Sequence, residues 1–147
     1  MSRDGKFAHG GGNLGYLLKR AQLAFRARMD EALKPLGITA PQYAVLSSLF
    51  IEPGISSAAL ARVAFVTPQS MQGIVANLEK LNLIQRAADP GHGRILQSHL
   101  TERGKAVLAR AHKSANAVET AMAGGIAARD LTLFKSLLMR AAENLGG

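Results

Sequence analysis

Residues 66–104 read VTPQSMQGIVANLEKLNLIQRAADPGHGRILQSHLTERG, and the spacing of their apolar side chains changes once along this stretch. At first they recur at every third or fourth position, which is the period of a helix with one buried face. Thr67 followed by Pro68 is typical of a helix start, because the hydroxyl caps the first turn and proline fits its first position. The positions that we expect this helix to bury are Met71, Ile74, Val75, Leu78 and Leu81.

A β-hairpin is predicted to follow this helix. Residues 83–88 and 94–100 are two short extended runs, and the segment 89–93 between them, DPGHG, consists of turn-forming residues. Thr101 then stands where its side chain can cap another helix. The sequence therefore predicts one small antiparallel sheet in a chain that is otherwise helical.

Helical patterns extend upstream of this stretch. Apolar side chains recur at helical spacing over residues 13–36, and Pro35 with Gly37 ends this first helix. Thr39 and Gln42 have the spacing of a capping box, in which each side chain binds a backbone amide of the other residue, so a second helix is predicted to start there.

The order of the predicted elements indicates the fold. A short helix that begins at Ser56 or Ser57 precedes the capped helix, and two further helices, separated by Gly124–Gly125, follow the hairpin. A short helix, a turn, a capped helix and a hairpin form, in this order, a winged helix-turn-helix. We therefore predict a mainly α fold with a small β-hairpin wing, a winged helix-turn-helix flanked by dimerisation helices.

The chain is expected to form one domain. Residues 1–12 are polar and glycine-rich, which favours a flexible tail. Residues 13–147 are predicted to be a single winged-helix domain of ordinary size. Within it we call residues 40–101 the reader, and we expect dimerisation helices at 13–36 and 101–145.

The composition excludes several classes of protein. The chain has 147 residues, no cysteine and a hydrophobic fraction of 48%, which argues against disorder, a disulfide framework and thiolate metal sites. No apolar run approaches the roughly 20 residues that a membrane span needs, and the N-terminus lacks the apolar core of a secretory signal. We therefore expect a cytoplasmic protein without a membrane partner.

The net charge of +8 favours a polyanionic partner. Residues 1–40 contribute +4 and residues 105–147 contribute +3, whereas residues 41–104 contribute only +1. The charge therefore favours nucleic-acid binding in general without locating the binding surface.

The capped helix at residues 68–81 has the two faces that a DNA-reading helix needs. Gln and Asn side chains opposite its apolar face can pair with adenine, Ser can bind either base type, and Gly73 allows a close approach to the duplex. Arg94 at the end of the glycine-rich turn suits the negative potential of the minor groove, and Arg86 on the facing strand suits a phosphate. An ordinary solvated helix face is the alternative interpretation. The predicted DNA-binding residues are Ser57, Thr67, Gln69, Ser70, Gln72, Asn77, Lys80, Arg86 and Arg94.

Six runs of this sequence resemble the MarR family of bacterial winged-helix transcriptional regulators. They are residues 36–39, 42–46, 66–71, 78–86, 89–94 and 100–104. The resemblance implies a triangular dimer in which the first, fifth and sixth helices pack across the two-fold axis. It also implies that the capped helix enters the major groove and that Arg94 is the minor-groove arginine. The family usually has an acidic residue two positions before that arginine, where this chain has His92.

A homodimer is also expected from the residues themselves, because the terminal helices are more apolar than one small domain can cover. Apolar residues that need a partner include Leu17, Met122, Phe134, Leu138 and Leu145. Two readers about 34 Å apart would address successive major grooves of duplex DNA, so we predict a pseudo-palindromic operator.

A small effector is implied by the same resemblance, since MarR-like proteins commonly respond to phenolic or carboxylate ligands held between the dimer helices and the reader. By position, such a site is expected to involve Gln22, Arg26, Tyr43 and Ser47. Arginine and tyrosine would suit a carboxylate or a phenol. The alternative is that Tyr43 belongs to the core and that Arg26 forms a salt bridge.

The function predicted from the sequence is a sequence-specific, DNA-binding repressor. The main alternative is a helical dimeric interaction module whose winged helix binds a protein instead of DNA. No nucleophile–base pair or carboxylate pair stands out, and the four histidines lack the spacing of metal ligands, so we expect no enzymatic activity, no cofactor and no metal.

Overall fold

The computed structural model describes residues 13–89 and 91–147, and all of their side chains except those of residues 89 and 92–96. The predicted tail at residues 1–12 lies outside this part. The elements are α1 (Leu14–Leu33), the 3₁₀ helix η2 (Lys34–Leu36), α2 (Ala40–Ile51), α3 (Ser57–Val63), α4 (Pro68–Lys80), β1 (Ile84–Asp89), β2 (His92–Leu100), α5 (Glu102–Met122) and α6 (Ala128–Asn144). The predicted fold class, mainly α with a β-hairpin wing, is confirmed.

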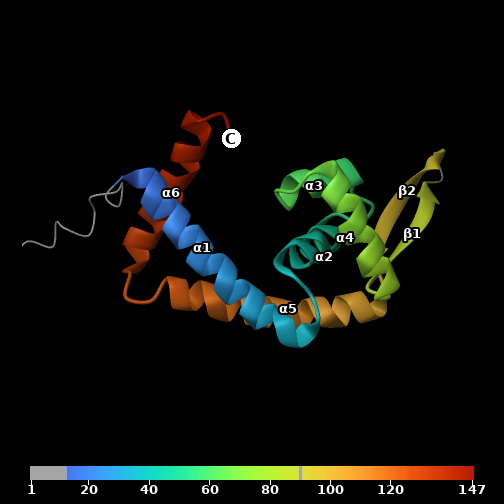
Figure 1. The fold of residues 1–147 in the computed structure, drawn as a ribbon, viewed down its shortest axis with the longest axis horizontal. Helices are drawn as coiled ribbons and strands as arrows, with labels where there is room; N and C mark the ends of the chain where they lie inside the picture. Colours follow the sequence, from blue (N-terminus) through green and yellow to red (C-terminus); the bar gives the residue numbers. More distant parts are fainter. Residues whose placement is uncertain (1–12, 90) are drawn as a thin grey trace, which may run out of the picture.

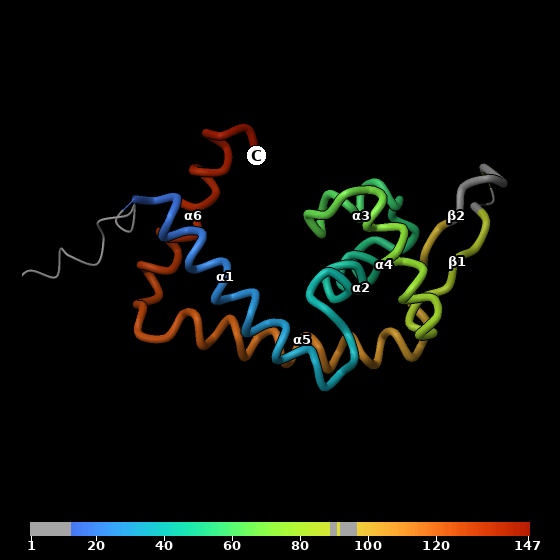
Figure 2. Tube along the Cα trace, in the orientation of Figure 1, coloured from blue at the N-terminus to red at the C-terminus, as the bar shows by residue number. Residues whose placement is uncertain are grey.

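The molecule has the reader at one end. At the other end lie α6, the start of α1 and the end of α5, which we call the arm (Figure 1). Figure 1 shows α2, α3, α4 and the hairpin grouped together, while α6 and the start of α1 lie apart from them. The long helix α5 runs from the hairpin to the arm and connects the two ends (Figure 2). The strands pair antiparallel, with Ile84 opposite Leu100 and a shift of register after Ala88.

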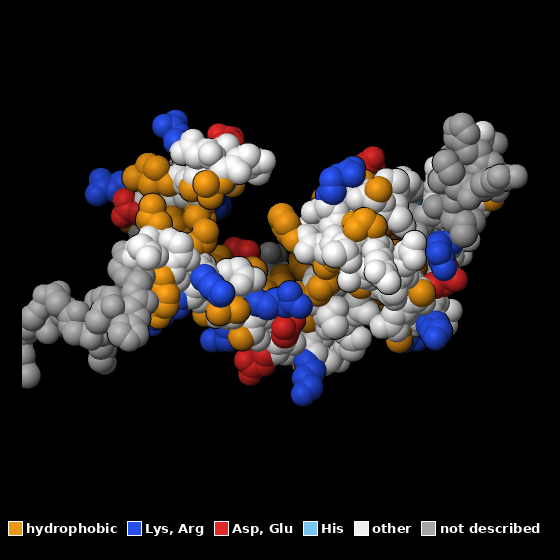
Figure 3. Space-filling model, turned by 45° about the horizontal axis from the view of Figure 1, so that its top comes forward, with side chains coloured by type: hydrophobic (Ala, Val, Ile, Leu, Met, Phe, Trp, Pro, Cys, Tyr) orange, Lys and Arg blue, Asp and Glu red, His pale blue; other side chains and the backbone are white. Residues whose placement is uncertain are grey.

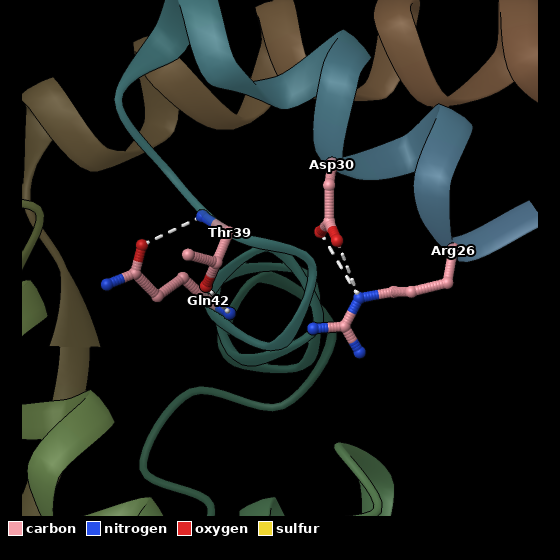
Figure 4. Close-up of polar contacts among 4 residues, drawn as sticks. All are labelled: Arg26, Asp30, Thr39 and Gln42. Atoms are coloured by element: carbon pink, nitrogen blue, oxygen red, sulfur yellow. Dashed lines mark hydrogen bonds and ion pairs between the residues drawn. The ribbon is translucent and has the colours of Figure 1, made fainter. Parts of the chain in front are cut away.

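Local side-chain caps set the starts of five helices. Each of these capping side chains accepts a hydrogen bond from the backbone N–H three residues later, which satisfies an amide that the helix leaves unpaired. The caps are Asn13, Thr39, Ser56, Thr67 and Thr101. At α2 the predicted capping box is complete, since Gln42 Oε1 also accepts from the Thr39 N–H at 2.9 Å (Figure 4). No side chain caps α6.

The hydrophobic core lies inside the reader and between it and one face of α5. It takes Met29 and Leu33 from α1, Val45, Leu46 and Leu49 from α2, Leu60 and Ala61 from α3, Met71, Val75 and Leu78 from α4, and Leu108, Ala111, Ala115 and Val118 from α5. In contrast, α6 buries no residue. No helix in the described part of the chain is long and apolar enough to cross a membrane.

One sequence-based expectation about burial was wrong. Leu81 was expected in the core, but it is the C-cap of α4 and its exposed fraction is 36%. It continues the helical stripe of α4 past the point where the chain offers a packing partner. In contrast, the five apolar residues that were expected to need a partner are all exposed in the single chain: Leu17, Met122, Phe134, Leu138 and Leu145.

The junction between the reader and α5 is close-packed around Gly104. The Gly104 N–H donates to Thr101 Oγ1 at 2.9 Å, and the Thr101 N–H donates to the Leu83 carbonyl at 3.1 Å. A Cβ atom at residue 104 would clash with the Leu83 carbonyl oxygen. Only glycine fits this position without moving the backbone.

Gly104→Ala is therefore predicted to destabilise the protein by about 3 kcal/mol, the upper range for overpacking, because the new methyl group meets backbone rather than a flexible side chain. Thermal unfolding followed by circular dichroism should show a decrease in Tm of about 10 °C. Arg103→Ala, at the exposed neighbouring position, is the control and should change the free energy of unfolding by less than about 0.5 kcal/mol. Equal Tm values for the two variants would contradict the packing described here.

Candidate nucleic-acid interface

Helix α4 has one buried and one exposed face. Met71, Val75 and Leu78 on the first face are at most 1% exposed and anchor the helix in the reader. The side chains on the other face are exposed and almost all uncharged: Gln69, Ser70, Gln72, Asn77 and Lys80. Gly73 lies on the same face, and no atom lies within 4 Å of the position that its Cβ would occupy. The exposed face of α4 therefore presents hydrogen-bond donors and acceptors around Gly73, which has no side chain.

The start of α4 is held by Thr67 and Ser70. Thr67 Oγ1 accepts from the Ser70 N–H at 3.1 Å and donates to Ser70 Oγ at 3.0 Å. Since the Thr67 hydroxyl makes both bonds within the helix, its role here is that of a cap. The Ser70 hydroxyl accepts the second bond, and its own hydrogen stays available to an external acceptor.

The remaining predicted DNA contacts differ in their surroundings. Ser57 is exposed in the first turn of α3, next to the capping residue Ser56. Arg86 on β1 donates through Nε to Glu79 Oε2 of α4 at 2.6 Å, so its charge is paired within the reader. Arg94 and His92 lie in β2, and their side chains fall outside the described ones.

A second feature is a pocket of about 450 Å³ between α1, α2 and α5, which we call the effector pocket. Its lining residues are Phe25, Arg26, Met29, Ala40, Tyr43, Ala115, Asn116 and Glu119. The volume lies in the range of small-molecule sites, and the walls are mainly apolar with a few polar groups, as is typical of such sites.

Arg26 supplies the cationic group of this pocket. Its Nε lies 3.1 Å from Asp30 Oδ2, one turn further along α1, and its guanidinium points toward the first turn of α2 (Figure 4). Both hydrogen bonds from Arg26 to Asp30 are made through Nε, at 3.2 and 3.1 Å. Arg26 thus forms the salt bridge of the alternative interpretation and also lines the pocket, and its role in binding a ligand stays a prediction.

Tyr43 faces the pocket and also bonds across to α5. Its hydroxyl oxygen lies 2.7 Å from His112 Nδ1, and the two rings meet edge to face with centroids 5.4 Å apart. Both side chains are half-buried. This bond links the reader to the long helix beside the pocket.

Of the four residues expected at an effector site, the structure brings together only Arg26 and Tyr43. Gln22 is exposed on α1 and does not line the pocket. Ser47 does not line it either, and its Oγ is buried without a hydrogen-bond partner among the described residues.

The structure adds residues of α5 that the sequence analysis did not assign to this site. His112, Ala115, Asn116 and Glu119 follow one another at intervals of three, one and three residues, which places them on one helix face. That spacing was the only available signal, because nothing local in the sequence indicates that Tyr43 lies opposite. No group of three or more potential metal ligands occurs among residues 13–89 and 91–147.

Comparison with known proteins identifies relatives along most of the chain. Residues 36–95 match the profile of the MarR family. The HTH-type transcriptional repressor Rv2887 of Mycobacterium tuberculosis is 39% identical over 133 residues, which cover 90% of this chain and 93% of the relative. The transcriptional regulator HosA of Escherichia coli is 31% identical over 103 residues, 70% of this chain and 76% of the relative.

Solved structures agree with this assignment. Rv2887 in complex with salicylic acid has a TM-score of 0.72 at 38% identity, over 88% of this chain and 96% of that one. Its complex with DNA has a TM-score of 0.70 at 36% identity, over 92% and 98%. The repressor CouR of Rhodococcus jostii, bound to a 23-mer DNA duplex, has a TM-score of 0.85 at 27% identity, over 92% and 96%. The chain belongs to the MarR family of winged-helix transcriptional regulators.

Proposed function

We propose that this chain is a homodimeric transcriptional repressor that binds duplex DNA through α4 and the hairpin, and that a small aromatic acid in the effector pocket releases it. The main support is the structure of α4, which exposes a polar and largely uncharged face while its opposite, apolar face is buried in the core. The complexes of Rv2887 with DNA and with salicylic acid support it. We expect the protein in the cytoplasm, because a bacterial repressor acts on the chromosome there.

In the proposed complex, α4 enters the major groove of the DNA, and the hairpin lies along the sugar–phosphate backbone next to the minor groove. Gln69, Gln72 and Asn77 offer amide groups that can pair with adenine, and Ser70 has a free hydroxyl hydrogen. Lys80, in the last turn of α4, is placed for a phosphate. Because Glu79 already pairs with Arg86, the uncharged residues and Arg94 carry a large share of recognition in this proposal.

The second copy of the chain covers the apolar arm. The exposed apolar side chains of α6 include Leu133, Phe134, Leu137, Leu138 and Met139. In Figure 3 hydrophobic side chains gather on α6 and on the start of α1, next to a hollow that separates them from the reader. A face of this kind on a soluble monomer is unusual and marks an interface. Two-fold pairing through the arm gives the two readers that a palindromic site requires.

The effector pocket lies where the arm meets the reader, since α1 and α5 supply one side and α2 supplies the other. A ligand that contacts both sides favours the relative placement of arm and reader in which it binds best. The dimer is released from DNA if, in that placement, the distance between its two α4 helices no longer matches the distance between successive major grooves. Arg26 and Tyr43 are the groups suited to the carboxylate of the ligand.

The DNA-binding proposal predicts a steep salt dependence. Fluorescence anisotropy with the duplex upstream of the protein's own gene should show an affinity loss of roughly 10³ or more between 50 and 200 mM salt, if about 6 to 10 phosphates are contacted. Arg94→Ala should weaken binding, whereas Gln69→Ala should chiefly change base preference. Arg129→Ala, on the arm, is the control arginine variant. Unaltered binding in both reader variants would favour the alternative, a protein-binding module.

Gly73→Ala is predicted to separate stability from DNA binding. Alanine should stabilise α4 by about 1 kcal/mol, because glycine is a poor helix former and the space around it is open. The added methyl group should nevertheless weaken DNA binding, since it stands between the helix and the duplex. Gly15→Ala on α1 is the matched control, which should leave DNA affinity unchanged. Full DNA affinity in Gly73→Ala would show that α4 does not approach DNA at this position.

The dimer is tested by placing a charge on the arm. Phe134→Glu should convert the dimer to a monomer in size-exclusion chromatography with light scattering, because a carboxylate cannot be buried between apolar helices without a partner. The reader should remain folded, since α6 contributes nothing to its core. Phe134→Leu keeps the apolar character and should remain dimeric. A monomeric wild-type protein at micromolar concentration would refute this part of the proposal.

A further inference from the structure

The hydrogen bond between Tyr43 and His112 lies beside the effector pocket and joins two helices that the ligand would contact. It connects residues 69 positions apart, with 2.7 Å between the hydroxyl oxygen and Nδ1. Tyr43 itself lines the pocket. His112 stands one turn before Ala115, on the face of α5 that also lines it, so it reaches the pocket through Tyr43.

The direction of this bond decides what Tyr43 can offer to a ligand. If Nδ1 has no hydrogen, it accepts the phenolic hydrogen, and the Tyr43 oxygen presents only lone pairs to the pocket. If Nδ1 carries the hydrogen, it donates to the Tyr43 oxygen, and the phenolic hydrogen is free to turn toward the ligand. The same tyrosine is therefore an acceptor in one state and a donor in the other.

Because of the charges around the pocket, binding of an anion is sensitive to whether Tyr43 acts as a hydrogen-bond donor. Arg26 has its Nε engaged by Asp30 at 3.1 Å, so its terminal nitrogens are the donors that it retains for a ligand. Glu119 also lines the pocket and forms no ion pair with any residue in the described ranges. A carboxylate bound here gains from Arg26 and is opposed by Glu119. A second donor would strengthen its binding, and Tyr43, which lines the pocket with Arg26, carries a hydroxyl that can supply one.

We propose that His112 is a positioning residue for the effector: its Nδ1–H holds the Tyr43 oxygen and leaves the phenolic hydrogen for the carboxylate of an aromatic acid. The pocket then selects an aromatic carboxylate over the neutral amide of the same shape. Phe25, Met29 and Ala115 provide the apolar walls for the ring. This inference rests on the effector-controlled release proposed above and assigns the ligand selectivity of that site to two residues of this chain.

The experiment compares salicylate with salicylamide, a pair that differs mainly in charge. Affinities are measured by calorimetry on the full-length dimer for the wild type, Tyr43→Phe, His112→Phe and the double variant. The wild type should prefer salicylate. Each single variant should reduce the ratio of the two affinities by about tenfold, the value of one charge-assisted hydrogen bond, and the double variant should reduce it no further.

His112→Asn is the variant that separates a specific role from a structural one. Its side-chain amide can donate from near the position of Nδ1, so the preference for salicylate should be restored. His112→Phe preserves the edge-to-face ring contact with Tyr43, and its Tm and DNA affinity without ligand report whether the fold is intact. Additive effects of the two single variants, or equal losses in His112→Asn and His112→Phe, would overturn the inference.

The same titrations distinguish this inference from the proposed function. If neither compound binds the wild type or releases it from DNA, effector control itself is wrong and the inference falls with it. If salicylate releases wild-type protein and His112→Phe keeps the wild-type affinity ratio, the proposed function stands and only the role of His112 is refuted.

Discussion

The contact between the backbone of Gly104 and the carbonyl of Leu83 holds the reader and the long helix in one arrangement. Around it, the Thr101 hydroxyl donates to the Asn82 carbonyl at 2.6 Å, while its oxygen accepts from the Gly104 N–H at 2.9 Å. Asn82 has a φ of 57°, which turns the chain out of α4 and into β1. The end of α4, the hairpin and the start of α5 are thus fixed by a few short bonds. A looser junction would let the angle between α4 and the arm vary, and two such arms could not present two helices at a fixed spacing.

The division between reader and arm follows from where apolar surface is buried. The reader satisfies its apolar residues within one chain, whereas α6 leaves its own exposed. In the proposed dimer, the arm gains its stability from association, and the spacing of the two readers is a property of the dimer rather than of the chain. In the proposed mechanism, a ligand at the base of the arm can therefore affect DNA binding without touching α4.

The elements that the sequence predicts well are those whose cause is local. The caps at Thr39, Thr67 and Thr101 are visible because a hydroxyl and the amide that it binds are three residues apart. The hairpin is visible because its turn residues interrupt two extended runs. The exposed face of α4 follows from periodicity once its buried face is known. For these features, one window of sequence contains both partners of the interaction.

The features that were missed depend on contacts between distant parts of the chain. Leu81 continues the apolar stripe of α4, yet no element packs against the last position. Arg86 was expected to be free for a phosphate, and only the folded hairpin brings it to Glu79. Tyr43 and His112 meet because α2 crosses α5, and neither residue carries a signal of the other. Placement of Arg26 and Tyr43 came from a family resemblance, which supplied the tertiary arrangement that local patterns lack, but the resemblance did not include His112.

The distribution of charge is consistent with recognition by shape and hydrogen bonding more than by bulk attraction. Only +1 of the net charge of +8 lies in residues 41–104, and one of the arginines there, Arg86, is already paired with Glu79. A reader with little excess charge binds non-specific DNA weakly, because non-specific affinity comes mainly from phosphate neutralisation. In the proposed complex, discrimination between the operator and other DNA then depends on the uncharged side chains of α4, which the dimer presents in two copies. In the proposed complex, a change in the spacing of the two readers weakens DNA binding, because either reader alone would make only half of the base and phosphate contacts.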